Sequence, residues 1–229
     1  MYVKGAGTVR RTKSESEETR QRILDAAETV FLDVGVSRAS LERIATEAGV
    51  TRGAIYWHFA NKKELLEAII GRVHGRHQAV VARTFEGGAE PLQKVLDWAL
   101  EVIEAFATEE HTRKVYTIIV TRCEYVGEMQ QARRLQQTMH DTMAANFQSA
   151  FEAAEAAGQL AEGWNAASAS ITLQCFMSGL LDNWLRYDFD ADVAKKLRAG
   201  LASLMASFRA GAGLAALASV SPDEGGGTT

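Results

Sequence analysis

The chain has 229 residues, of which 47% are apolar and 24% are charged, a balance that is ordinary for a soluble globular protein of one large domain or two small ones. No apolar run approaches the ~20 residues that a membrane helix needs, and the basic N-terminal stretch lacks the apolar core of a secretory signal. The two cysteines, Cys123 and Cys175, lie far apart in the sequence and are interpreted as reduced thiols. We therefore expect a cytoplasmic protein that does not bind a membrane.

The net charge of −4 is unevenly distributed along the chain. Residues 1–63 contain 11 Lys and Arg against 8 Asp and Glu, whereas the remainder contains 14 against 21. Such an asymmetry is typical of a basic end that meets phosphate and an acidic body that does not. An excess of this size also arises by chance, so the charge pattern alone does not identify a nucleic-acid-binding protein.

The first helical pattern begins at Ser14, after a Gly-, Arg- and Lys-rich arm at 1–13 that is predicted to be disordered. The arm is either a solvated tail or a segment that enters a minor groove. Apolar residues then recur at helical spacing from Ile23 to Val34, and Gly35 is expected to end this helix. The apolar stripe provides a surface on which shorter helices can pack.

Residues 40–59, SLERIATEAGVTRGAIYWHF, are predicted to form two short helices joined by a tight turn. Ser40 can cap the first helix and Thr51 the second, because a hydroxyl accepts hydrogen bonds from the free N–H groups at a helix start. Gly49 follows the apolar face of the first helix, where a residue with positive φ is most often needed. With Arg, Tyr and His in its second helix, this stretch is typical of a helix-turn-helix DNA-binding motif.

Helical periodicity continues beyond this motif. A long helix is expected from 62 to about 83, followed by a helix that begins at Pro91 and by helices over about 112–126, 128–157, 166–187 and 191–210. The predicted fold is therefore all-α, with nine helices. The predicted organisation is a disordered basic arm at 1–13, a helix-turn-helix DNA-binding domain at 14–60, a connecting helix at 61–86, a helical body at 87–210 and a loose tail at 211–229.

The helix-turn-helix region closely resembles the DNA-binding domain of the TetR family of transcriptional repressors. The matching residues are Ile44-Ala45, Ala48-Gly49-Val50, Thr51-Arg52-Gly53-Ala54-Ile55-Tyr56, Trp57-His58-Phe59, Lys62 and Glu64-Leu65-Leu66. The run GVTRGAIYWHF, together with RCEYVGEM at 122–129 and SGLLDNWL at 178–185, is similar to the AcrR and TtgR branch, whose members repress multidrug efflux pumps. The resemblance covers residues 13–208. It implies a nine-helix fold, ligand binding and dimerisation by the body at 87–210, and a homodimer with double-stranded operator DNA and a small-molecule inducer as partners. No cofactor is expected.

The residues expected to face DNA come mainly from the second helix of the motif. Small residues at Gly53 and Ala54 allow close approach to base edges, and Arg52 can offer a bidentate fork to guanine. The other members of this set are Thr51, Tyr56, Trp57 and His58. The resemblance adds Thr19, Ser40 and Lys62 as anchors of the phosphate backbone. The competing interpretation is a structural helix-turn-helix that binds no nucleic acid.

Aromatic and sulfur-containing side chains of the body are interpreted either as core residues or as the lining of an adaptable apolar pocket. The resemblance implies such a pocket. Its candidate residues are Ile70, His74, Trp98, Phe106, Tyr116, Cys123, Phe147 and Met177, with Glu124, Gln137 and Gln174 as polar anchors.

Two apolar stripes near the C-terminus indicate a dimer surface. Their members are Leu180 and Trp184 in one helix and Leu197, Leu201, Leu204 and Phe208 in the next. Paired with a twofold copy, the two helices would form a four-helix bundle. The alternative is packing onto the chain's own body, and both arrangements can hold for different residues.

No catalytic constellation is recognisable in the sequence, and His74 and His77 lack the further ligands of a metal site. We therefore expect no catalytic and no metal-binding residues. The predicted function is that of a ligand-responsive repressor that binds a palindromic operator as a homodimer, is released by small apolar or aromatic inducers and controls a multidrug efflux operon. The alternatives are a TetR-type regulator of a metabolic operon with a metabolite ligand, and a helical enzyme that carries a DNA-binding head.

Overall fold

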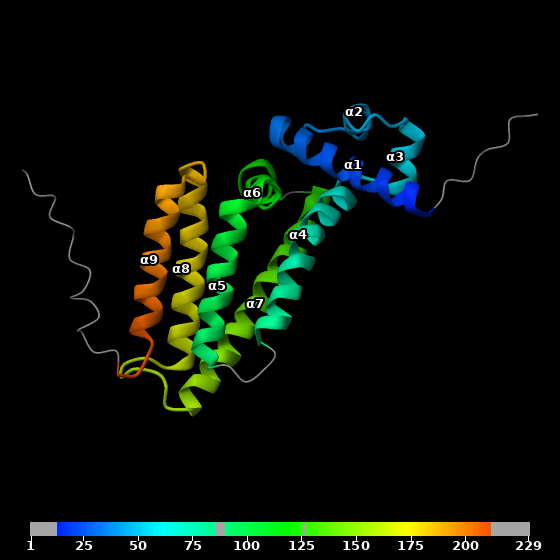
Figure 1. Ribbon diagram of the computed structural model, residues 1–229. Coiled ribbons are helices and arrows are strands. Elements are labelled where there is room, and N and C mark those ends of the chain that lie inside the picture. Colours follow the sequence, from blue (N-terminus) through cyan, green and yellow to red (C-terminus); the bar gives the residue numbers. More distant parts are fainter. Residues whose placement is uncertain (1–12, 86–89, 126, 212–229) are drawn as a thin grey trace, which may run out of the picture. The chain divides into compact units, whose positions relative to one another are not determined.

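The computed structural model describes residues 13–85, 90–125 and 127–211. Within these ranges the chain forms nine α-helices, one π-helical turn and one 3-10 turn, and no strand (Figure 1). The expectation of an all-α fold with nine helices is therefore confirmed. None of the described helices combines the length and the apolarity that a membrane crossing requires.

The chain divides into two compact units that do not follow the order of the sequence. The head unit consists of Met1–Val73 and Lys114–Leu135, and the body unit consists of His74–Arg113 and Gln136–Thr229. Because the boundary falls inside three helices, each of these helices begins in one unit and ends in the other. They are α4 (Lys62–Phe85), α6 (Glu110–Thr117) and α7 (Gln130–Ala156).

The head unit is organised around α1 (Lys13–Val34), whose apolar stripe is fully buried at Ile23, Leu24 and Phe31. Two short helices, α2 (Leu41–Glu47) and α3 (Arg52–His58), follow it. α1 packs against α2, and α2 packs against α3. Two seven-residue helices cannot bury a core alone, so the long helix supplies the surface that they need.

The π-helical turn η1 (Ile118–Arg122) replaces part of the helix that was predicted over 112–126. α6 ends at Thr117, the wider turn follows, and Cys123 is already extended. Two donors use carbonyls of this turn. The nearby Tyr125 hydroxyl donates to the Ile119 carbonyl, and the distant Val36 N–H donates to the Arg122 carbonyl. A short 3-10 turn, η2 (Gly127–Met129), then precedes α7.

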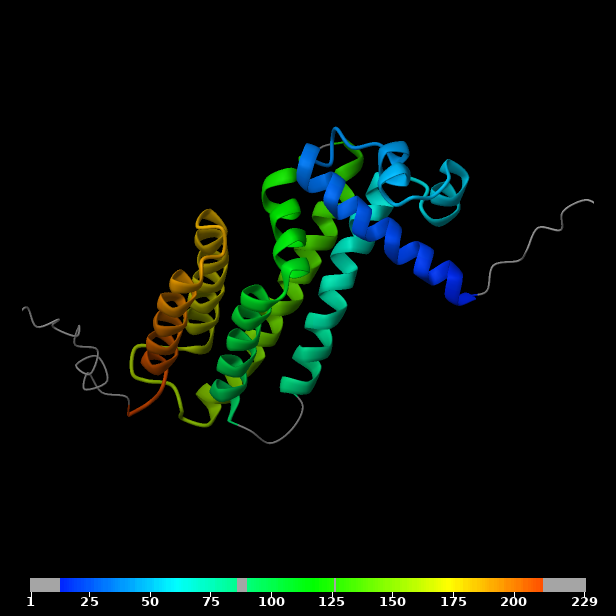
Figure 2. The same ribbon diagram turned by 45° about the horizontal axis from the view of Figure 1, so that its top comes forward.

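The body unit contains α5 (Pro91–Thr108), α8 (Ala166–Arg186) and α9 (Ala191–Ser207). α9 packs against both α5 and α8, and α8 and α9 run side by side in both ribbon views (Figures 1 and 2). α9 ends three residues earlier than predicted. The chain that follows it pairs instead with the loop before α8, through the Ala161 N–H to the Phe208 carbonyl at 2.9 Å.

Aromatic rings fill much of the body core. Phe208 meets Phe151 and Trp164 edge to face, with ring centroids 5.2 and 4.7 Å apart. At the other end of α9, Phe189 meets Trp184 edge to face, with ring centroids 5.7 Å apart, and adopts a left-handed φ of 57°. The Trp184 indole N–H donates to the Asp190 carbonyl at 2.8 Å, which fixes the strained turn before α9.

Candidate nucleic-acid interface

The caps of the two short helices form as expected from the sequence. Ser40 has an extended backbone, and its Oγ accepts the Arg43 N–H at 3.1 Å. Thr51 does the same for α3, where its Oγ1 accepts the Ala54 N–H at 3.2 Å. Gly49 adopts a φ of 62° at the turn, a conformation that a side chain would strain. Local residue types therefore determine where both helices begin and where the chain reverses.

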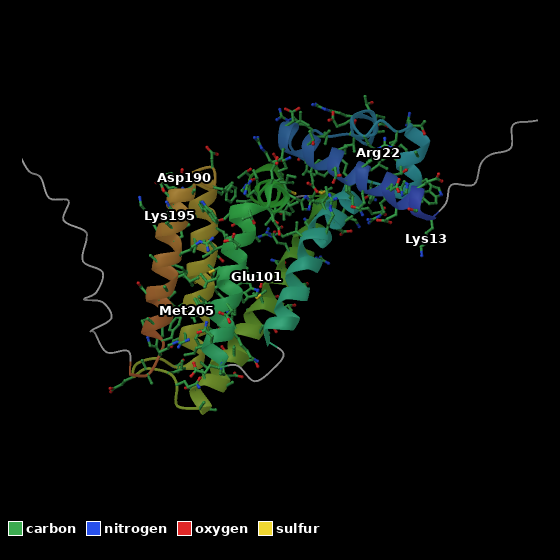
Figure 3. The ribbon with its side chains drawn as sticks, viewed as in Figure 1. Lys13, Arg22, Glu101, Asp190, Lys195 and Met205 are labelled. Carbon is green, nitrogen blue, oxygen red and sulfur yellow. The ribbon has the colours of Figure 1, made fainter. Side chains whose placement is uncertain are left out.

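Arg22 of α1 holds this turn in place (Figure 3). Its guanidinium donates to the Ala48 carbonyl at 2.6 Å and to the Gly49 carbonyl at 3.2 Å. These carbonyls lie at the C-terminal end of α2, where the helix dipole favours a cation. This role could not be predicted from the sequence, because no spacing rule relates Arg22 to a turn 26 residues later.

One face of α3 is buried in the head unit and the other is exposed. Ile55 is fully buried and Phe59, which caps the helix, is also buried, whereas the Trp57 side chain is 73% exposed. Arg52 and Tyr56 share the exposed face with Trp57. Gly53 is exposed beside them, and Ala54 and His58 are half-buried at the edge. Exposure of large side chains on a short helix is uncommon for a purely structural element and is typical of a binding face.

Glu42, on the first turn of α2, contacts two side chains of that exposed face. Its Oε1 accepts the Tyr56 hydroxyl at 3.1 Å and lies 3.4 Å from Nη2 of Arg52. The Arg52 guanidinium also lies over the Tyr56 ring, 5.7 Å from its centroid. Hydrogen bonds from the backbone N–H of Glu42 and from Tyr56, together with the charge of Arg52, lower the pKa of the Glu42 carboxyl. Glu42 was not among the residues predicted from the sequence.

Three residues predicted to anchor the phosphate backbone are engaged within the head unit. Thr19 is buried, and its hydroxyl donates to the Glu15 carbonyl at 2.8 Å. The Ser40 hydroxyl caps α2, and the Lys62 ammonium donates to the carbonyls of Val36 and Ser37, each at 2.9 Å. The role of Thr19 as a phosphate anchor stays a prediction, since in the protein without DNA its hydroxyl is used within α1. Lys62 ties the start of α4 to the loop before α2.

The predicted pocket residues are divided between the two units. Ile70, Tyr116, Cys123 and Glu124 belong to the head unit, and Trp98, Phe106, Gln137, Phe147, Gln174 and Met177 belong to the body unit. Glu124 and Gln137 are exposed, and the side chains of His74 and His77 lie outside the described part of the structure. Burial is the main cause that raises the pKa of the Cys123 thiol, so this cysteine is a poor nucleophile at neutral pH.

Trp98 is the pocket candidate with an unsatisfied polar atom. Its ring is buried against Phe147 in an edge-to-face contact, with centroids 4.8 Å apart. Among the described residues its indole Nε1–H finds no acceptor. A buried donor without a partner is costly, so this N–H favours an acceptor supplied by water or by a bound molecule.

The predicted dimer residues also fall into two groups. Leu180, Trp184, Leu201 and Phe208 are buried in the chain's own core, whereas Leu197 and Leu204 keep exposed surface. A hollow of about 590 Å³ lies between α8 and α9. Its lining consists of Cys175, Phe176, Gly179, Leu180, Asn183, Tyr187, Val193, Lys196 and Leu197.

The chain matches two family descriptions that together cover most of its length. Residues 23–69 match the N-terminal domain described as bacterial regulatory proteins of the tetR family, and residues 90–209 match the MAATS-type transcriptional repressor C-terminal region. The HTH-type transcriptional repressor BepR of Brucella suis is 38% identical over 208 residues, which are 90% of this chain and 99% of BepR. TtgR of Pseudomonas putida, an HTH-type transcriptional regulator, is 35% identical over 87% of this chain and 97% of its own.

Solved structures of transcriptional repressors are also similar to this chain. NalD, the secondary repressor of the MexAB-OprM multidrug efflux pump in Pseudomonas aeruginosa, superposes with a TM-score of 0.76 at 33% identity, over 86% of this chain and 98% of NalD. SmeT in complex with triclosan superposes with a TM-score of 0.75 at 30% identity, over 85% of this chain and 93% of SmeT. The family is one of DNA-binding regulators and not of enzymes. The chain belongs to the TetR family of bacterial transcriptional repressors and is similar to repressors of multidrug efflux pumps.

Proposed function

We propose that this protein represses a multidrug efflux operon by binding a palindromic operator as a homodimer, and that a small aromatic inducer releases it. The observation that carries the proposal is the exposed face of α3, which presents Arg52, Tyr56 and Trp57 beside a capped helix start. The likeness to NalD, whose target is an efflux pump, supports the choice of operon.

The chemistry of the α3 face suits the major groove of DNA. Arg52 has a largely exposed guanidinium, and a guanidinium can donate two hydrogen bonds to O6 and N7 of guanine. The exposed Gly53 next to it leaves room for the backbone to approach a base edge. The free N–H groups at the start of α3 suit phosphate oxygens, which fix the position of the helix without reading sequence.

The surface of α8 and α9 supports a dimer. Ile171 is a large apolar residue that is 55% exposed, and Cys175 and Gly179 follow it at successive turns on the same helix. The hollow between α8 and α9 lies beside them, and its apolar members would be covered by a second copy. In such a dimer the two α3 helices bind half-sites about one turn of DNA apart, roughly 34–36 Å.

The interior of the body supports an aromatic ligand with an oxygen acceptor. Trp98 and Phe147 form a buried aromatic pair, and the Trp98 Nε1–H lacks an acceptor among the described residues. Triclosan, which is bound in the SmeT structure, suggests this class of ligand. An acceptor atom on the ligand would satisfy the buried donor while its rings cover the apolar wall.

Binding to the DNA upstream of the protein's own gene tests the repressor function. Footprinting of the full-length protein should protect a near-palindrome, and Arg52→Ala should cost about 1–3 kcal/mol in operator binding and relax preference at one position. Equal losses of affinity for operator and for scrambled DNA would show that Arg52 contacts phosphate and does not read a base. A wild-type protein that protects no upstream segment would contradict the proposal.

Ligand response is tested by linkage between the two binding events. Triclosan affinity should fall in the presence of saturating operator, and operator affinity should fall by the same factor in the presence of triclosan. A factor of roughly 5–150 is typical of such coupling. Binding should quench or shift the fluorescence of Trp98, and Trp98→Phe should remove that signal. Equal triclosan affinities with and without operator would exclude induction by this compound.

A further inference from the structure

The two side chains of α3 that are best suited to contact DNA are both bonded to one carboxylate in the free protein. Glu42 accepts the Tyr56 hydroxyl at 3.1 Å and pairs with Arg52 at 3.4 Å. Arg52 in turn lies over the Tyr56 ring. The three residues therefore form a closed triad that links the first turn of α2 to the exposed face of α3.

The triad places a negative charge on a surface that is proposed to face a polyanion. Glu42 is half exposed, and the interactions that hold it favour its ionised form. A carboxylate repels phosphate, and it also cancels the charge of the guanidinium beside it. While Arg52 stays paired with Glu42, the α3 face lacks most of the attraction that an isolated arginine would exert on any DNA.

When Arg52 leaves Glu42, the contacts that replace the lost ion pair differ between DNA sequences. At a guanine in the matching position, Arg52 exchanges the carboxylate for two acceptors in a fixed geometry. On unrelated DNA only phosphate oxygens are available, and the unpaired Glu42 carboxylate then faces them at close range. The ion pair therefore weakens binding to unrelated DNA more than binding to the operator.

We infer that Glu42 is a specificity-determining residue of the DNA-binding face, which restrains Arg52 and Tyr56 so that they are released only at the matching sequence. The inference rests on the proposed operator binding and adds to it a residue outside the recognition helix. Glu42 acts through Arg52, so removal of its charge should change discrimination between sequences and not simply the overall affinity.

Glu42→Gln tests the inference because glutamine keeps the shape of the side chain and an acceptor for Tyr56 but loses the charge that holds Arg52. Fluorescence anisotropy of the full-length protein on its upstream operator and on a scrambled duplex of equal length and composition gives both affinities. Affinity for the scrambled duplex should rise roughly two- to fivefold, the range of an exposed ion pair. For the scrambled duplex, the slope of log affinity against log salt concentration should become steeper by about one. Operator affinity should change less, so the ratio of the two affinities falls.

Glu47→Gln is the matched control, because Glu47 is an exposed carboxylate on the same helix that makes no hydrogen bond or ion pair to α3 among the described residues. It should leave the ratio unchanged. In an Arg52→Ala background, Glu42→Gln should also lose its effect on the ratio. Circular dichroism spectra of all variants establish that the head unit remains folded.

Three results overturn the inference. Equal increases on both duplexes, from Glu42→Gln and from Glu47→Gln alike, would show only general repulsion of DNA by negative charge. A loss of operator affinity alone would make Glu42 a direct base contact. If Glu42→Gln lowers the affinity ratio equally in the Arg52→Ala background, Glu42 does not act through Arg52. A wild-type protein that does not distinguish the two duplexes is a separate result, because it contradicts the proposed function itself.

Discussion

The backbone N–H of Val36 donates a hydrogen bond to the carbonyl of Arg122 at a distance of 2.9 Å. The bond joins the loop before α2 to the end of the π-helical turn, 86 positions further along the chain. It satisfies an amide that belongs to no helix and a carbonyl at a helix end, two groups that are costly to leave unpaired. Residues 114–135 therefore belong to the same compact unit as the DNA-binding helices.

Gly35 directly precedes the donor of this hydrogen bond. Its φ is 80°, and an added Cβ would lie 3.4 Å from the Arg122 carbonyl oxygen. Gly35→Ala should destabilise the head unit by about 1–2 kcal/mol, because an L side chain is strained in the left-handed region. Urea denaturation followed by circular dichroism measures the change.

Gly71→Ala is the control for this prediction. Gly71 lies in the part of α4 that belongs to the head unit, and the space around its Cβ position is open. This variant should therefore be more stable than the wild type by about 0.5–1 kcal/mol. A neutral Gly35→Ala would contradict the strain argument.

Arg72 attaches the head portion of α4 to α1 through a cluster of acceptors. Its guanidinium pairs with the buried Glu28 and with Asp25 at 2.7 Å, and it donates to Gln21 at 3.0 Å. Arg72→Met should cost about 3–5 kcal/mol, because it breaks a largely buried ion pair with the Glu28 carboxylate. The double variant Arg72→Met, Glu28→Met should recover most of that loss in chemical denaturation.

Asp25→Asn provides the comparison for the Arg72 cluster. The Asp25 side chain is mostly exposed, so its pair with Arg72 should contribute less than about 1 kcal/mol. A single Arg72→Met variant as stable as Asp25→Asn would show that Glu28 is satisfied by other partners.

The sequence predicts the parts of this fold that are determined by near neighbours. The caps at Ser40 and Thr51, the left-handed turn at Gly49 and the apolar stripe of α1 all follow from spacings of a few residues. The motif also identifies the exposed face of α3. These features are predictable because hydroxyl caps, positive φ and the 3.6-residue period depend on local geometry.

Contacts between distant residues could not be predicted in the same way. Nothing in the sequence pairs Glu42 with Arg52 and Tyr56, Arg22 with the turn at Gly49, or Lys62 with the loop at Val36. The dimer residues could not be predicted fully for a similar reason. An apolar stripe indicates which positions are buried, but not whether the same chain or a second copy covers them. Leu201 and Leu180 fit the expected stripe and yet are covered by their own chain.

The thiol of Cys123 should respond to pH differently from that of an unfolded chain. Burial raises its pKa above the ordinary value of 9.0, so the folded protein holds the proton to a higher pH. Folded stability is therefore unaffected below the unfolded pKa and falls as pH rises above it, because the unfolded thiol ionises first. Alkylation by iodoacetamide in the Cys175→Ser variant, followed by mass spectrometry, isolates Cys123.

The expected rate at pH 8 is several-fold slower in the native protein than in urea, and the native rate should continue to rise beyond pH 9. Equal rates in the native and unfolded chain would contradict burial of the thiol. Because Cys175→Ser replaces an exposed side chain by a similar one, it should not disturb the fold.

Ile171 gives the sharpest test of the proposed dimer surface. Its side chain is 55% exposed on α8, so Ile171→Glu should leave the single chain folded. If a second copy covers this face, the new carboxylate is buried without a partner. That burial should weaken the dimer by about 3 kcal/mol, or roughly 100-fold in dissociation constant. Sedimentation equilibrium at several protein concentrations measures the change directly.

Two further variants make the dimer result interpretable. Ala153→Glu adds the same charge to an exposed position of α7 and should not change the dissociation constant. Leu201→Glu is unsuitable on its own, because Leu201 is fully buried in its own chain and the variant should unfold the body. Ile171→Glu should also lose most of its operator affinity, since each monomer then binds a half-site without the gain from its linked partner. If Ile171→Glu has the same dimer dissociation constant as the wild type, the dimer interface does not include this face of α8, whatever the effect of the variant on DNA binding.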